Sequence, residues 1–256
     1  MRGLSLENVL WVNGTCFFML LSAMLYRKRV YRNVPMFTAW INVAFLNALV
    51  LIIVSRFGTA HLYTIIFWAF ALLDIALQIA VVYEFAQRAF RVEGIWPPKM
   101  RARVLRFSAV SGLIGVVSTV ASSPAVNSEV DLLLAHLELL SSVFVFSFCL
   151  LIFNLAYQSG ALWSQSDFRR FNGFLLWATA SAFTDSIHAY WRTASSFQQL
   201  EVCRVLFSEL IVAYWIVNCV FPKAEHRTAP PVGLGRIAVV YKNSDEGSSH
   251  VELGAA

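Results

Sequence analysis

Residues 34–55 read VPMFTAWINVAFLNALVLIIVS and contain no charged side chain. A transmembrane helix needs about 20 mostly apolar residues to cross roughly 30 Å of hydrocarbon, and this segment is long enough and apolar enough to do so. A strand of a membrane barrel would alternate apolar and polar residues, whereas Leu46–Val54 (LNALVLIIV) carries apolar residues on both faces. The segment therefore predicts a membrane-spanning helix.

Six further segments have a similar character. The segment at 107–122 is the weakest, because it is short and contains Gly112 and Gly115, and the segment at 171–191 is interrupted by Asp185 and His188. We expect an all-α fold, a seven-transmembrane helix bundle in residues 1–222, and a mobile cytoplasmic tail in residues 223–256. The predicted spans are approximately 9–26, 34–55, 62–83, 107–122, 132–157, 171–191 and 205–221.

The overall composition agrees with a membrane protein. Of the 256 residues, 58% are apolar and only 14% are charged, whereas soluble domains have roughly 45–50% apolar and about 25% charged residues. This balance excludes a soluble enzyme, a nucleic-acid-binding domain and a disordered chain. The net charge of +5 is then interpreted as basic excess in cytoplasmic loops.

The distribution of lysine and arginine predicts the orientation. Sixteen of the 20 basic residues fall between the first and second spans, between the third and fourth, just before the sixth, or in the tail. The other side has only Arg2, Arg56, Arg192 and Arg204. Under the positive-inside rule the N-terminus is outside and the C-terminus is cytoplasmic. The basic stretch Arg88–Arg106 is expected to contact anionic lipid headgroups.

Ionisable residues inside the predicted spans are candidates for a functional site, because burying them in a bilayer is costly. With the predicted orientation, most of them fall in the outer half of the membrane. We expect them to line one polar cavity that opens outward and binds a ligand. The candidate ligand-binding residues are Asp74, Glu138, Asp185, His188 and Glu209.

A purely structural role is the alternative for each of these residues, because membrane helices use polar side chains to stabilise their packing. His136 and Glu138 are two residues apart and therefore point to different sides of a helix. We place Glu138 inside the bundle and His136 near the outer membrane interface.

Two cofactor-dependent classes can be weighed from residue types. A retinal protein needs a lysine inside a span, but the four lysines, Lys28, Lys99, Lys223 and Lys242, all lie outside the spans, so retinal is excluded. A metal-dependent intramembrane hydrolase of lipid amides would need histidines and a carboxylate around zinc. The candidate ligands are His61, His136, Asp185 and His188, but they show no characteristic metal-binding spacing.

The function that the sequence favours is a non-enzymatic sensor or receptor with an outward-facing polar cavity and no cofactor. Signalling would need a separate cytoplasmic partner, because no output domain follows the last predicted span. The hydrolase remains one alternative. A proton-coupled transporter is the other, since intramembrane carboxylates can relay protons.

Several short motifs resemble those of a group of uncharacterised seven-helix bacterial inner-membrane proteins, over residues 20–222. More loosely, the arrangement is similar to the seven-helix input region of some bacterial histidine kinases, but without their catalytic domain. The resemblance implies the topology and a location in the bacterial inner membrane, and it implies no catalytic residues. The motifs are Leu25-Tyr26-Arg27, Tyr31-Arg32-Asn33-Val34-Pro35-Met36-Phe37, Val82-Tyr83-Glu84, Leu105-Arg106-Phe107 and Ser122-Ser123-Pro124.

Overall fold

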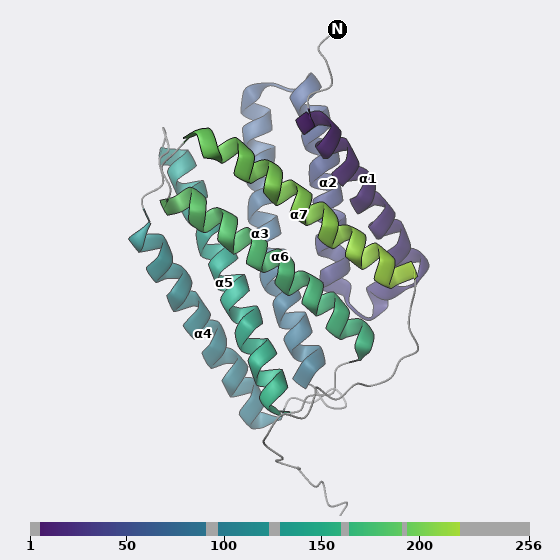
Figure 1. The fold of residues 1–256 in the computed structure, drawn as a ribbon, viewed down its shortest axis with the longest axis vertical. Coiled ribbons are helices and arrows are strands. Elements are labelled where there is room, and N and C mark those ends of the chain that lie inside the picture. Colours follow the sequence, from purple (N-terminus) through teal and green to yellow (C-terminus); the bar gives the residue numbers. More distant parts are fainter. Residues whose placement is uncertain (1–5, 91–96, 123–128, 160–163, 191–193, 221–256) are drawn as a thin grey trace, which may run out of the picture.

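The computed structural model describes residues 6–90, 97–122, 129–159, 164–190 and 194–220, and the predicted tail at 223–256 lies outside them. The described residues are almost entirely helical (Figure 1). One short 3₁₀ helix, η1 (Val30–Arg32), lies in the turn after the first α-helix. The α-helices are α1 (Leu6–Arg27), α2 (Pro35–Phe57), α3 (Ala60–Phe90), α4 (Pro98–Ala121), α5 (Glu129–Ser159), α6 (Gln165–Tyr190) and α7 (Ala194–Val220).

Five of these helices, α2, α3, α4, α5 and α7, are long and apolar enough to cross a membrane. The expectation of an all-helical, multi-pass membrane protein is therefore confirmed at this level. Helices α1 and α6 are not among the five, so the seven-span count and the orientation of the termini stay predictions.

Six helices form a closed ring. In chain order around the ring, α1 packs against α2, α2 against α3, α3 against α5, α5 against α6, α6 against α7, and α7 against α1. Helix α4 packs against α5 from outside this ring and lies at the edge of the bundle (Figure 1). Side chains that point into the ring are therefore shielded from lipid by neighbouring helices.

Several helices extend beyond the predicted spans. Helix α4 begins at Pro98, nine residues before the predicted start at position 107, so Lys99 and Arg106 lie on helical turns and not in a loop. Proline suits the first turn of a helix, because it fixes φ and its missing N–H would have no helical partner there. The predicted span starts only at position 107 because the basic side chains in the first turns of α4 lower the hydropathy of that segment.

An aromatic cluster fills the ring at the end where α2 and α6 begin. Phe37 and Trp40 of α2 pack against Trp215 of α7, with ring centroids 5.1 and 6.0 Å away. Phe85 of α3 and Phe174 of α6 complete the cluster, with centroids 6.0 Å apart. All five side chains are buried, so this cluster joins the consecutive helices α2 and α3 to the consecutive helices α6 and α7.

Glycine sets how closely α4 approaches α5. A Cβ atom at Gly115 would lie 2.9 Å from Leu140 Cδ1 and 3.0 Å from the Leu140 carbonyl oxygen. Three residues earlier on the same helix, a Cβ at Gly112 would meet nothing within 4 Å. The two glycines of the weakest predicted span therefore have different roles, and only Gly115 is a packing requirement.

Replacing Gly115 with alanine is expected to destabilise the protein by about 1–3 kcal/mol, the usual cost of overpacking, because the Leu140 backbone cannot move aside easily. Gly112→Ala is the matched control and should be neutral or stabilising by roughly 0.5–1 kcal/mol, because alanine loses less backbone entropy in a helix. Thermal unfolding of both variants in detergent measures the difference. Equal melting temperatures would contradict this account of the α4–α5 contact.

Candidate functional site

Asp74 lies in the middle of α3, and its carboxylate accepts two side-chain hydrogen bonds. The indole Nε1 of Trp40 donates to Oδ1 at 2.8 Å, and the amide of Gln78, one turn further along α3, donates to Oδ2. The side chains of both donors are buried. Asp74 is thus directly connected to the aromatic cluster through Trp40.

Asp185 of α6 is buried and forms an ion pair with Arg204 of α7, with Oδ1 and Nη1 3.6 Å apart. Arg204 is also close enough to interact electrostatically with Asp74. Arg204, one residue before the predicted span at 205–221, is the third residue of the apolar stretch Val202–Cys219 of α7. Its side chain is 37% exposed, so the buried member of this ion pair is Asp185.

Glu209 is a further buried carboxylate on α7, and it faces α1. Its Oε2 accepts a hydrogen bond of 2.8 Å from Asn13 Nδ2. Its Oε1 is buried and accepts no hydrogen bond within the described part of the chain. A Cβ at Gly14 would come within 3.4 Å of that oxygen, so the glycine leaves room for the carboxylate between the two helices.

The remaining candidates are less enclosed. Glu138 and His188 are half-buried, and each has an interaction partner. His136 is also half-buried, and its Nε2 atom has no hydrogen-bond partner among the described residues. His61 is exposed at the start of α3. Asp74 and Asp185 both interact with Arg204, Asp185 through an ion pair and Asp74 through its charge.

No group of three or more His, Cys, Asp and Glu side chains that could hold a metal ion occurs among the described residues. The four candidate zinc ligands thus receive no support from this geometry.

At the opposite end of the ring, Glu84 of α3 closes the first turn of α2. Its two carboxylate oxygens accept hydrogen bonds from the backbone N–H groups of Met36 (3.0 Å) and Phe37 (2.9 Å). The first N–H groups of a helix have no partner within the helix, and a carboxylate at this position also interacts favourably with the helix dipole. Val34, the residue before α2, provides no side-chain cap, so Glu84 takes over that role from another helix.

One turn further along α3, Arg88 ties α3 to α6. Its Nη2 and Nε contact Oδ2 of Asp167 at 2.9 and 3.0 Å, and its Nη1 donates to the backbone carbonyl of Asn33. Asp167 also pairs with Arg170, at 3.0 Å. Arg88 belongs to the Arg88–Arg106 stretch that is expected to contact lipid headgroups, and it is engaged in this network. Within that stretch, the other basic residues described as exposed lie on α4: Lys99, Arg101, Arg103 and Arg106.

The network of Glu84, Arg88 and Asp167 was not predicted from the sequence, although Glu84 belongs to one of the motifs named above. The segment Tyr31–Phe37 and the segment Val82–Glu84 meet in space, where Glu84 caps α2. The available signal was the spacing of Glu84 and Arg88, one helical turn apart at the end of an apolar span. Nothing in the sequence alone identified Asp167 as their common neighbour.

No protein-family model, curated protein or solved structure matches this chain. The function of this protein is therefore inferred from the contacts described above.

Replacing Asp167 with asparagine should destabilise the bundle by about 1–3 kcal/mol, because two guanidinium groups lose their shared, largely buried acceptor. Thermal unfolding in detergent measures this loss. The double variant Arg88→Gln/Asp167→Asn should lose less than the sum of the two single changes, because the residues interact. Arg103→Gln, on the exposed face of α4, is the control and should change stability by less than about 0.5 kcal/mol. Strict additivity would show that Arg88 and Asp167 do not interact.

Proposed function

We propose that this chain is a sensor-like or receptor-like protein of the bacterial inner membrane, and that it binds a small polar ligand among the acidic side chains of the ring interior. The observation that carries this proposal is the pairing of Asp185 with Arg204 inside the bundle, with Asp74 nearby. Charged groups in an apolar surrounding are costly to maintain, and a ligand site is one reason to keep them.

The proposal includes seven spans with the N-terminus outside and the C-terminus in the cytoplasm. Helix α6 lies between α5 and α7, both of which are apolar enough to cross. Its 26 residues would measure about 39 Å at 1.5 Å per residue, enough to span the bilayer beside them. Part of its polar character comes from residues that are buried in the bundle, namely Asp167, Thr184 and Asp185.

A ligand that carries a positive charge suits this interior. The candidate residues include the four carboxylates of Asp74, Glu138, Asp185 and Glu209, which exceed the single guanidinium of Arg204 in charge. A cationic ligand would compete with Arg204 for Asp185. Because Asp74 is bonded to Trp40, a change in this network would also reach the aromatic cluster at the other end, where a separate cytoplasmic partner would read it.

Reporter fusions test the topology. Alkaline phosphatase fused after residue 59 or within 123–128 should be active, because these connections are expected outside the cytoplasm. A fluorescent protein fused at residue 256 should fold and fluoresce in the cytoplasm. A fluorescent-protein fusion at residue 256 that inserts but does not fluoresce, with inactive phosphatase at both other positions, would contradict the proposed orientation.

Asp185→Asn tests the ligand site. Thermal unfolding of the purified wild-type protein is measured against a panel of small amines and cationic amino acids. We expect at least one compound to stabilise the wild type and to lose its effect on Asp185→Asn, because the amide no longer attracts a cation. Thr179→Ala is the control, since Thr179 lies on the exposed side of the same helix, and it should respond like the wild type.

Two results would redirect the assignment. An Asp185→Asn variant that no longer inserts or purifies would mean that Asp185 stabilises helix packing. About one zinc per wild-type chain by elemental mass spectrometry, lost in the same variant, would favour the lipid-amide hydrolase instead.

A further inference from the structure

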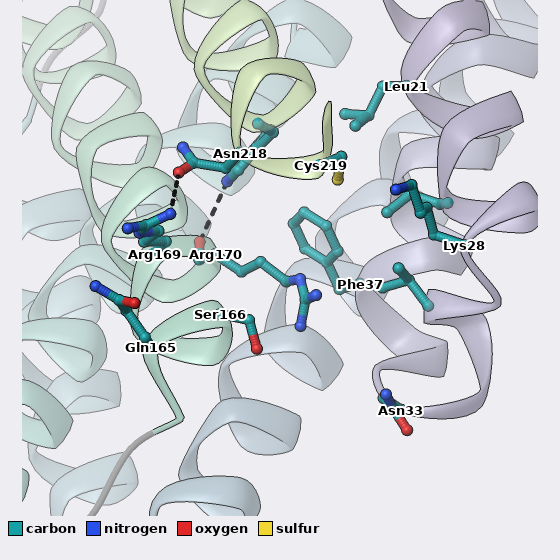
Figure 2. Close-up of a pocket in the computed structure, with 13 residues that line it drawn as sticks. Leu21, Lys28, Asn33, Phe37, Gln165, Ser166, Arg169, Arg170, Asn218 and Cys219 are labelled. Atoms are coloured by element: carbon teal, nitrogen blue, oxygen red, sulfur yellow. Dashed lines mark hydrogen bonds between the residues drawn. The ribbon is translucent and has the colours of Figure 1, made fainter. Parts of the chain in front are cut away.

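A cleft of about 200 Å³ opens at the end of the ring where α2 and α6 begin (Figure 2). It lies between the end of α1 on one side and the first turns of α6 and last turn of α7 on the other. At roughly 30 Å³ per liquid water molecule, the cleft has the volume of about seven waters. This is enough for a phosphate group with a few attached atoms, and too small for a drug-sized ligand.

The charged side chains that line the cleft are all basic: Lys28, in the turn that follows α1, and Arg169 and Arg170 of α6. Arg170 extends from α6 toward the middle of the cleft, and Lys28 lies opposite it (Figure 2). Arg170 is paired with Asp167. No carboxylate lies within ion-pair distance of Lys28 or Arg169 in the described part of the chain, and Arg169 donates only to the neutral amide of Asn218, at 3.2 Å. Two positive charges of the cleft are therefore not compensated by these residues.

Backbone polarity adds to this positive character. Gln165 and Ser166, the first residues of α6, line the same cleft. The N-terminal end of a helix carries a partial positive charge and N–H groups that favour anions. Arginine guanidinium groups match the geometry of phosphate oxygens, and lysine adds a mobile point charge.

The turn that carries Lys28 is held in a defined shape. Arg29 adopts a left-handed backbone conformation with φ 54°, which non-glycine residues adopt at a cost. Backbone hydrogen bonds from Lys28 to Met24 (2.9 Å) and from Val34 to Val30 (3.0 Å) bracket the turn. The turn thus holds Lys28 at the mouth of the cleft.

The inner wall of the cleft is apolar. Leu21, Leu25, Phe37 and Trp215 line it, and all four are buried within the ring. A free inorganic anion would use only the basic mouth, whereas an amphiphile would also contact this wall. Exposed Tyr26 on the same turn fits a position at headgroup level, where tyrosine is enriched.

We propose that this cleft binds a phosphate group carried by an amphiphile, of which an anionic phospholipid is the nearest source. Lys28, Arg169 and Arg170 would contact the phosphate oxygens, and the apolar wall would contact the adjoining carbons. The site is separate from the acidic interior and from the exposed basic face of α4, so it does not depend on the proposed sensor function.

Native mass spectrometry of the full-length protein in a neutral detergent, titrated with phosphatidylglycerol or phosphatidylcholine, tests the site. The wild type should retain phosphatidylglycerol more tightly than phosphatidylcholine. Lys28→Gln/Arg169→Gln should weaken phosphatidylglycerol retention by about 30-fold, from the loss of two cationic contacts. Arg101→Gln/Arg103→Gln removes the same charge from the exposed face of α4, which is also expected to contact headgroups but does not line the cleft, and it should weaken retention clearly less than the cleft variant.

The outcomes separate the source of the phosphate from the existence of the site. Inorganic phosphate that binds lipid-free wild type, and loses this binding in Lys28→Gln/Arg169→Gln, would support the same site with a soluble ligand. Equal lipid retention by the two double variants would overturn the proposal, whether both are weakened or neither is. Lys28→Gln alone, measured in parallel, keeps the test valid if the double variant does not fold, because the Lys28 side chain has no partner among the described residues.

Discussion

The carboxylate of Glu84 is the constraint on which the basic end of the bundle depends. It closes the first turn of α2 from a neighbouring helix, so the start of α2 and the end of α3 cannot separate without exposing two backbone N–H groups. Unpaired backbone donors are expensive wherever water is scarce. The Arg88–Asp167 pair extends the same connection to α6. The aromatic cluster and the basic cleft both form between helices that these contacts hold in place.

The two ends of the ring differ in how their charges are arranged. Toward the middle and the far end, the polar groups are carboxylates with Arg204 as a shared cation. At the basic end, Asp167 is shared between Arg88 and Arg170, and additional basic groups face a cleft. One end thus has an arginine that interacts with two carboxylates, and the other end has a carboxylate that pairs with two arginines. The cationic ligand and the phosphate group proposed above would each bind at the end whose charges oppose their own.

Much of the fold could be predicted from sequence, because helices that face lipid must be about 20 residues long and apolar. Helix positions followed from that rule, but polar residues at helix ends concealed the first turns of α4 and α6. Pairing could not be predicted in the same way. Arg204 is the third residue of the apolar stretch Val202–Cys219, and its partner, Asp185, lies on another helix. Glu84 likewise acquires its role only when α2 lies beside α3.

Glycine at position 173 lets the indole of Trp215 lie directly against the backbone of α6. A Cβ at Gly173 would lie 2.4 Å from the Trp215 Nε1 atom, and that nitrogen donates a hydrogen bond to the carbonyl oxygen of Arg170 at 3.3 Å. Trp215 therefore connects the aromatic cluster to a residue that lines the basic cleft. Any larger side chain at position 173 would disturb both contacts of the indole at once.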